Sequence, residues 1–168
     1  MENKLINASQ KTKIVISDAG IKPVDRNSFE GEVFNSTNFK IYILKHTDIY
    51  LYVGKTKQKI GTRLQQGFRS YKNDSANNRQ AGYGGYKWIK KYINTNMHLH
   101  LFVFDLGTSY SDNHTEAIEA EIVYEIRKAT NQWPLFQTEI HFYNDSEDFK
   151  DAKDIAKELL EKTKDLNI

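Results

Sequence analysis

Two short apolar runs near the middle of the chain are separated by a polar stretch. Residues 39–44 and 49–54 are dense in Ile, Tyr, Leu and Val, and residues 45–48 between them read Lys-His-Thr-Asp. Such residues fit a pleated, half-buried surface. The pattern therefore predicts an antiparallel hairpin. Two further runs, residues 13–17 and 99–106, predict additional strands, the second buried on at least one face.

Helical patterns follow the hairpin. A short helix is expected to begin near Gly61 and a second to cover residues 86–93. Between them, residues 72–85 are rich in Asn, Gly and Ser and predict a loop. Asn113 stands three residues before Glu116, which is the spacing of a capping box. We therefore expect a longer helix from residue 113 to about 128, ended by the approach to Pro134.

A last amphipathic helix is expected at the C-terminal end. Ser146 is its predicted N-cap, and its apolar residues keep roughly helical spacing. These residues are Phe149, Ala152, Ala156, Leu159 and Leu160.

The order of elements predicts an α+β fold, built on a small antiparallel β-sheet flanked by helices. At 168 residues the chain has room for one ordinary domain with a real core. We divide it into an N-terminal extension (1–38), a core (39–145) and a C-terminal helix packed on that core (146–168). No cysteine is present, so disulfides and thiolate metal sites are excluded. With no signal-like apolar segment at the start, a cytoplasmic location is expected.

Positive charge is concentrated in one window. Residues 55–91 contain ten Lys or Arg and a single acid, Asp74, a net charge of +9, whereas the whole chain carries only +2. Aromatic residues are interleaved with these cations. Such a window suits the binding of a polyanion such as DNA, although a lysine-rich, solvated helix face remains an alternative. The cations are Lys55, Lys57, Lys59, Arg63, Arg69, Lys72, Arg79, Lys87, Lys90 and Lys91.

One glutamate falls on the apolar side of a predicted helix. Glu119 lies three, four and seven residues before Ile122, Val123 and Ile126, the offsets of neighbours on one helix face. An ionised carboxylate that faces a core must be paired, metal-bound or protonated. Glu119 is therefore either the partner of a core-lining arginine, a residue on a wet helix edge, or an oxygen ligand for a divalent cation.

The hairpin and its surroundings resemble the GIY-YIG nuclease family. The sequence reads Lys40-Ile41-Tyr42 on the first predicted strand, Tyr52-Val53-Gly54 on the second, and Arg63 nine residues after Gly54. Glu119, before the aliphatic pair Ile122-Val123, matches the metal-binding glutamate of that family. Residues 134–137 (PLFQ) match its Pro-x-aromatic-Asn segment, with Gln137 in place of Asn. The resemblance covers residues 39–137.

The resemblance implies an endonuclease that hydrolyses phosphodiester bonds in DNA with one Mg²⁺ or Mn²⁺. Tyr42 is the implied base or water-positioning group, and Tyr52 and Lys55 assist it. Arg63 clamps the phosphate and Glu119 binds the metal. Gln137 orients the metal-water shell, and the close approach of the substrate is expected at Gly54. The remaining cations of the 55–91 window follow the DNA backbone, DNA being favoured over RNA, and a homodimer is possible.

Three departures from the family pattern stand out. The first motif is KIY rather than GIY, and no His lies one turn after Arg63. The nine-residue spacing from Gly54 to Arg63 is one residue longer than in the homing and excision-repair branches and resembles that of the restriction-enzyme branch. Two other functions stay open at this point. One is a nucleic-acid-binding module that kept the fold without catalysis, and the other is a protein that binds a partner through its C-terminal helix.

Overall fold

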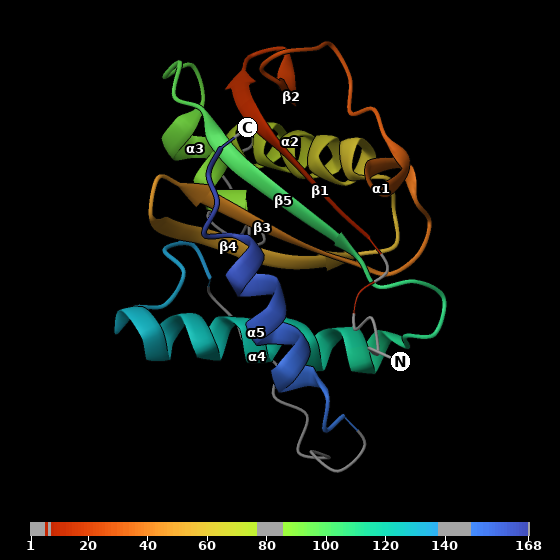
Figure 1. Cartoon of the computed structure of the whole chain (residues 1–168). Helices are drawn as coiled ribbons and strands as arrows, with labels where there is room; N and C mark the ends of the chain where they lie inside the picture. Colours follow the sequence, from red (N-terminus) through yellow and green to blue (C-terminus); the bar gives the residue numbers. More distant parts are fainter. Residues whose placement is uncertain (1–5, 7, 77–85, 138–148, 168) are drawn as a thin grey trace.

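A five-stranded antiparallel sheet forms the centre of the molecule (Figure 1). The computed structural model describes residues 6, 8–76, 86–137 and 149–167. The strand order is β2-β1-β5-β3-β4, so β4 is an edge strand and β5 is central. The strands are β1 (Ala8–Ser17), β2 (Gly20–Pro23), β3 (Lys40–His46), β4 (Ile49–Thr56) and β5 (Leu99–Asp105).

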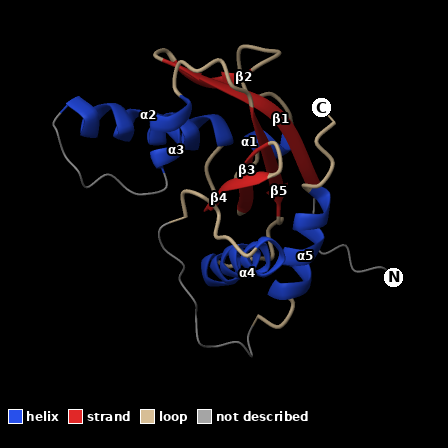
Figure 2. Cartoon of the chain, turned by 90° about the vertical axis from the view of Figure 1, so that its left-hand side faces the viewer, coloured by secondary structure: helices blue, strands red, loops and turns tan. Residues whose placement is uncertain are grey.

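Helices cover both faces of the sheet (Figures 1 and 2). One layer contains α1 (Glu32–Asn35), α2 (Ile60–Ala76) and α3 (Lys87–Tyr92), and the other contains α4 (Asp112–Thr130) and α5 (Ala152–Lys162). Because side chains alternate across a strand, Tyr42 and Leu44 enter the first apolar core while Ile41 and Ile43 enter the second. Coverage of both faces explains why β3 reads as a nearly continuous apolar run.

The N-terminal residues contribute to the same sheet. β1 begins at Ala8, five residues before the predicted strand, and pairs with β5 from Ala8 to Ile14. β2 then pairs with the second half of β1. Residues 8–23 therefore share a sheet and a core with the segment that carries the hairpin.

The first long helix corrects one prediction. α2 continues to Ala76, so the expectation that a loop begins at residue 72 is wrong up to that point. Tertiary contacts explain the extension, because Tyr71 packs against the core and Lys72 pairs with Asp18 at 3.2 Å and lies over the ring of Phe68. These contacts outweigh the weak helix propensity of the local sequence. Residues 77–85 of the predicted loop lie outside the described residues.

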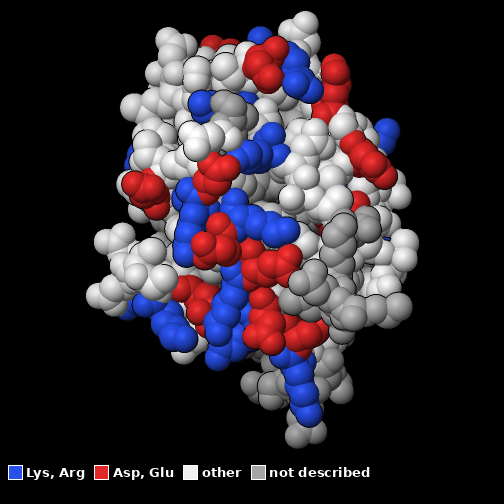
Figure 3. All heavy atoms as spheres, viewed as in Figure 1, with Lys and Arg blue, Asp and Glu red and all other residues white. Residues whose placement is uncertain are grey.

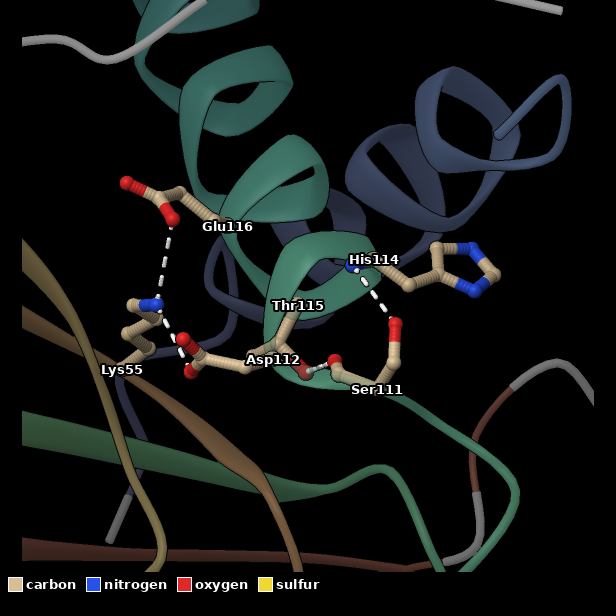
Figure 4. Close-up of polar contacts among 6 residues, drawn as sticks. All are labelled: Lys55, Ser111, Asp112, His114, Thr115 and Glu116. Atoms are coloured by element: carbon tan, nitrogen blue, oxygen red, sulfur yellow. Dashed lines mark hydrogen bonds and ion pairs between the residues drawn. The ribbon is translucent and has the colours of Figure 1, made fainter. Parts of the chain in front are cut away.

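The start of α4 corrects a second prediction. Its N-cap is Ser111 rather than Asn113, because the Ser111 hydroxyl accepts a hydrogen bond from the backbone N–H of His114 at 3.1 Å (Figure 4). Thr115 donates to the Ser111 carbonyl at 2.8 Å and closes the first turn. Glu116, the expected capping-box partner, turns instead toward Lys55. The helix ends at Thr130, before a left-handed Asn131.

The last helix lies against α4. Its buried residues are Ala152, Ile155, Ala156 and Leu159, which belong to the same apolar cluster as the inner face of α4. The predicted cap, Ser146, lies outside the described residues, and the described helix begins at Ala152 with Asp151 at its N-cap position. The other end of α5 is held by the sheet, since Lys45 donates to the Thr163 carbonyl at 3.1 Å. Among the described residues, no helix combines the length and apolarity that a membrane crossing requires.

The packing of α5 predicts different effects for two neighbouring leucines. Leu159 is fully buried, whereas Leu160 is only partly buried. We expect Leu159→Ala to lower the free energy of unfolding by about 2–4 kcal/mol, since it removes buried methyl groups and leaves a cavity. Leu160→Ala is the matched control and should lose less than half as much. Urea unfolding followed by circular dichroism measures both. Equal losses would show that α5 does not pack through Leu159.

Candidate active site

The predicted catalytic residues meet at the edge strand, between the two helical layers. β4 is the last strand of the sheet, and in Figure 2 it lies between α2 on one side and α4 on the other. Tyr42 reaches this edge from the neighbouring strand, where it stands opposite Gly54 in the register. A Cβ atom at Gly54 would lie only 2.5 Å from the hydroxyl of Tyr42. The absence of a side chain at residue 54 is therefore what allows the Tyr42 ring to lie across β4.

Arg63 contacts the far end of this ring. It lies in the first turn of α2, and its guanidinium is close enough to the Tyr42 hydroxyl to oppose the rise in the pKa of that group. Its buried Nε atom has no hydrogen-bond partner among the described residues. The ring of Tyr86 lies 5.7 Å from the guanidinium carbon, in space left by Gly67, where a Cβ would come within 2.2 Å of that ring. The guanidinium thus lies against two aromatic residues and keeps one donor that no described residue satisfies.

Burial sets the ionisation of Tyr42. The side chain is only 2% exposed, and burial raises its pKa to about 12, although the charge of Arg63 and its hydrogen bond act in the opposite direction. Burial is the largest single influence on Arg63 and lowers its pKa, but the opposing influences of Tyr42, Tyr86 and Tyr52 together make the net shift upward. At neutral pH the site therefore holds a neutral phenol against a fully charged guanidinium.

Tyr52 forms the floor of this arrangement. It is buried on β4, and its ring centroid lies 6.0 Å from that of Tyr42 at an interplanar angle of 44°. Its electrostatic influence, like that of Tyr86, helps to raise the pKa of Arg63. Tyr52 therefore supports the position of Tyr42 and Arg63 from within the core.

Glu119 faces the same centre from α4. It is partly buried, and burial raises its pKa to about 7, with Lys55 and Arg63 opposing the shift and Glu116 adding to it. Among the described residues, no ion pair to this carboxylate lies within 4.0 Å. The alternative that Glu119 is the salt-bridge partner of a core arginine thus finds no support in the described contacts. The site therefore contains a desolvated carboxylate that no described cation neutralises at ion-pair distance.

Lys55 connects the edge strand to the first turn of α4. Its ammonium lies 2.8 Å from Asp112 and 3.3 Å from Glu116 (Figure 4). Sequence reasoning missed both acids as members of the site. Their four-residue spacing, with Glu119 three residues further on, places all three on one side of α4 and is the signal that was available. Tyr86, the other residue missed as a neighbour of Arg63, carried no such signal.

The segment after α4 closes onto β4. The backbone N–H groups of Leu135 and Phe136 donate to the carbonyls of Tyr50 and Leu51 at 3.0 and 2.9 Å. The side-chain oxygen of Gln137 accepts from the backbone N–H of Val53 at 3.1 Å. These bonds bring Gln137 beside Gly54 and hold its amide at the edge of the strand.

Glu119 fits a divalent cation as a single protein ligand. The described residues contain no group of three His, Asp or Glu side chains that would enclose a metal ion. Mg²⁺ commonly takes one or two carboxylates and completes its shell with water and substrate phosphate. The raised pKa of Glu119 fits this arrangement, since a nearby cation would compensate for the lost hydration of the carboxylate.

The predicted DNA-binding cations are distributed around α2 and α3. Lys57 lies over the ring of Phe39 at 4.6 Å, and Lys91 lies over the ring of Phe136 at 5.9 Å. Lys72 is paired with Asp18, and Arg79 lies outside the described residues. The face seen in Figure 3 intermingles acidic and basic side chains and offers no surface of a single sign. The remaining cations are exposed: Lys59, Arg69, Lys87 and Lys90.

Trp88, which stands among these cations, is a core residue. It is 1% exposed and belongs to the apolar cluster of the first helical layer. Its burial leaves the Trp88 ring unavailable for stacking on bases.

Comparison of the chain with family models, curated proteins and solved structures found no match. The site therefore rests on its own geometry. From four separate elements the fold brings together Tyr42, Tyr52, Lys55, Arg63 and Glu119, which span 78 positions of the sequence.

The contact between Gly54 and Tyr42 predicts a non-additive pair of substitutions. Gly54→Ala should lower the free energy of unfolding by about 1–3 kcal/mol, because the new Cβ collides with the buried ring. In a Tyr42→Ala background the same change should cost much less, since the ring is gone. A double-mutant cycle from urea unfolding measures this coupling.

Gly61→Ala is the control for that cycle. A Cβ at Gly61 would meet its nearest atom, in Phe29, at 3.2 Å, and alanine favours the helix that begins here. Its stability should stay within about 1 kcal/mol of wild type. Equal effects of Gly54→Ala in both backgrounds would rule out the ring contact.

The raised pKa of Glu119 predicts a pH-dependent stabilisation by Glu119→Gln. In the folded state without metal, the pKa of the Glu119 carboxyl is about 7, whereas its ordinary value is 4.5. The folded protein therefore keeps this proton to a higher pH than the unfolded chain does. Wild type therefore loses stability as pH rises from 4.5 through 7, while the amide does not titrate. In metal-free buffer we expect the stability of Glu119→Gln, relative to wild type, to increase by up to about 3 kcal/mol between pH 4.5 and 8. Unfolding curves across that range give the difference, and a constant difference would contradict the shift.

Proposed function

We propose that this protein is a metal-dependent endonuclease of the GIY-YIG type that hydrolyses phosphodiester bonds in DNA. One observation carries the proposal. An arginine fixed by a buried tyrosine and a desolvated glutamate face one another at the edge of the sheet. A scissile phosphate needs positive charge on its oxygens, an oriented water and stabilisation of the leaving oxygen. These side chains supply or recruit each of the three.

Arg63 is the phosphate clamp in this mechanism. A guanidinium is always charged and presents several donors in a fixed plane. Its contact with Tyr42 fixes the orientation of that plane, and the buried Nε, which has no partner among the described residues, is a donor suited to a phosphate oxygen. Preorganised donors of this kind need no rearrangement when charge develops in the transition state.

Tyr42 positions the attacking water rather than removing its proton as a phenolate. With a pKa of about 12, the free hydroxyl is almost entirely protonated at neutral pH. Its hydroxyl, beside the guanidinium of Arg63, can donate a hydrogen bond that orients a water. The phenol therefore aligns the nucleophile with the phosphate that Arg63 holds.

Glu119 would hold the divalent metal ion. When bound, Mg²⁺ or Mn²⁺ supplies Lewis-acid polarisation of the phosphate and stabilises the leaving oxygen. Gln137 is fixed to β4 beside this position and orients water near it. Lys55, paired with Asp112 and Glu116, holds the first turn of α4 against β4 and so fixes the height of Glu119 above the strand.

The contacts count against a partner-binding role for the C-terminal helix. The apolar face of α5 is buried on α4, so it does not present a free hydrophobic surface. The non-catalytic binding module is the remaining second candidate, and a cleavage assay separates it from the endonuclease.

Supercoiled plasmid is the substrate for the first test. We expect nicking or linearisation with Mg²⁺ or Mn²⁺, none with EDTA, and a loss of about 100-fold or more in Arg63→Ala and Glu119→Ala. Glu121→Ala, from the same helix but outside the site, is the matched control and should retain activity. Discrete fragments would indicate sequence specificity. A wild-type protein that binds DNA and cuts no duplex, branched or RNA substrate would establish the binding module instead.

A further inference from the structure

Exposed apolar side chains gather at one end of the edge strand. Trp133 is 46% exposed and Leu135 is 52% exposed, and both lie on the segment that is hydrogen-bonded to β4. Ile49, also 52% exposed, directly precedes Tyr50, whose carbonyl accepts from Leu135. Large apolar side chains kept in water at one place indicate a contact surface rather than random exposure. None of these residues takes part in the site at Tyr42.

Trp133 is held in position rather than left loose. The guanidinium of Arg127 lies over its ring at 5.6 Å, and Arg127 is itself hydrogen-bonded to the carbonyl of Asn131. Pro134 is buried, and the next two backbone N–H groups are bonded to β4. A rigid indole with a cation on its ring is a surface on which an aromatic base can stack.

The hydrogen bonds along β4 connect this surface to the candidate active site. Gln137 is bonded beside Gly54, and Leu135 is bonded at Tyr50, four residues back along the strand. Four strand residues span about 13 Å, which corresponds to about four nucleotides at 3.4 Å each. The segment that carries Trp133 therefore lies along the same edge strand as Gly54, which stands opposite Tyr42 in the register.

We propose that Trp133, with Arg127 on its ring and Leu135 beside it, is a stacking platform for an unpaired nucleobase of a DNA strand that passes along the edge strand from the cleavage site. This inference rests on the proposed function and specifies its substrate as DNA with a locally unstacked base. Cations next to the platform favour nucleic acid over an apolar protein partner, since Arg127 covers Trp133 and Lys91 lies over the neighbouring Phe136. In a fully stacked duplex no base face is available to the indole.

The test measures binding without cleavage. Wild type and variants are titrated in EDTA with a labelled DNA duplex that carries one unpaired 2-aminopurine, and with the fully paired duplex. We expect Trp133→Leu to weaken binding to the first duplex by about 5- to 150-fold, the effect of one stacked base, and to abolish quenching of the 2-aminopurine. Trp133→Phe should retain most of the affinity. The salt dependence should not change, because no charge is removed.

Met97→Ala is the control, since Met97 is 47% exposed and lies at the turn before β5. It should bind both duplexes like wild type. If wild type binds and cuts DNA while Trp133→Leu matches Met97→Ala on both duplexes, the platform is refuted and the nuclease stands. If wild type binds neither duplex in EDTA, the platform is refuted, and plasmid cleavage with Mg²⁺ or Mn²⁺ decides the nuclease separately. A change in sedimentation of Trp133→Leu with unchanged DNA binding would make the surface an interface between copies of the chain, and would also overturn the platform.

Discussion

The packing of the Tyr42 ring against the backbone of Gly54 is the contact on which the candidate site depends. Antiparallel pairing puts the two residues opposite one another, and only a residue without a Cβ leaves room for the ring. The ring carries its hydroxyl across the edge strand to Arg63. Because α2 begins only four residues after β4 ends, Arg63 falls in the first turn of that helix, within reach of this hydroxyl. Strand register and a short connection thus determine the position of the charge.

The ionisable groups of the site are buried without full compensation of their charges. This arrangement favours the binding of a ligand at the expense of the stability of the fold. Burial keeps Tyr42 neutral and raises the pKa of Glu119, while Lys55 is paired with Asp112 and Glu116 rather than with Glu119. Perturbed groups of this kind concentrate at functional sites, where stability is commonly traded for activity. The two apolar cores offset this loss of stability, because helices cover both faces of the sheet.

The periodicity of apolar residues was sufficient to predict the hairpin, the central strand and the position of Glu119 on the inner side of α4. Burial determines which positions of these elements are apolar. Periodicity failed where tertiary contacts decide. The C-terminal half of α2 is held by Tyr71 and Lys72 against a composition that favours a loop. Ser111 caps α4 in place of Asn113, and Glu116, the expected capping partner, pairs with Lys55, a residue 61 positions away. The steric need for glycine at position 54 and the proximity of Tyr86 to Arg63 can be recognised only in the three-dimensional structure. Neither produces a periodic pattern in the sequence.

Glu119 is also the residue that most clearly separates a nuclease from a simple nucleic-acid-binding module. A binding module would gain from Arg63 and the cations of α2 and α3, since each attracts phosphate. A carboxylate beside the phosphate position that we propose does the opposite, because like charges repel most strongly where water is excluded. Burial of Glu119 increases this penalty. The penalty disappears when a divalent cation lies between carboxylate and phosphate, so the arrangement makes physical sense as part of a metal-dependent site and is unfavourable without one.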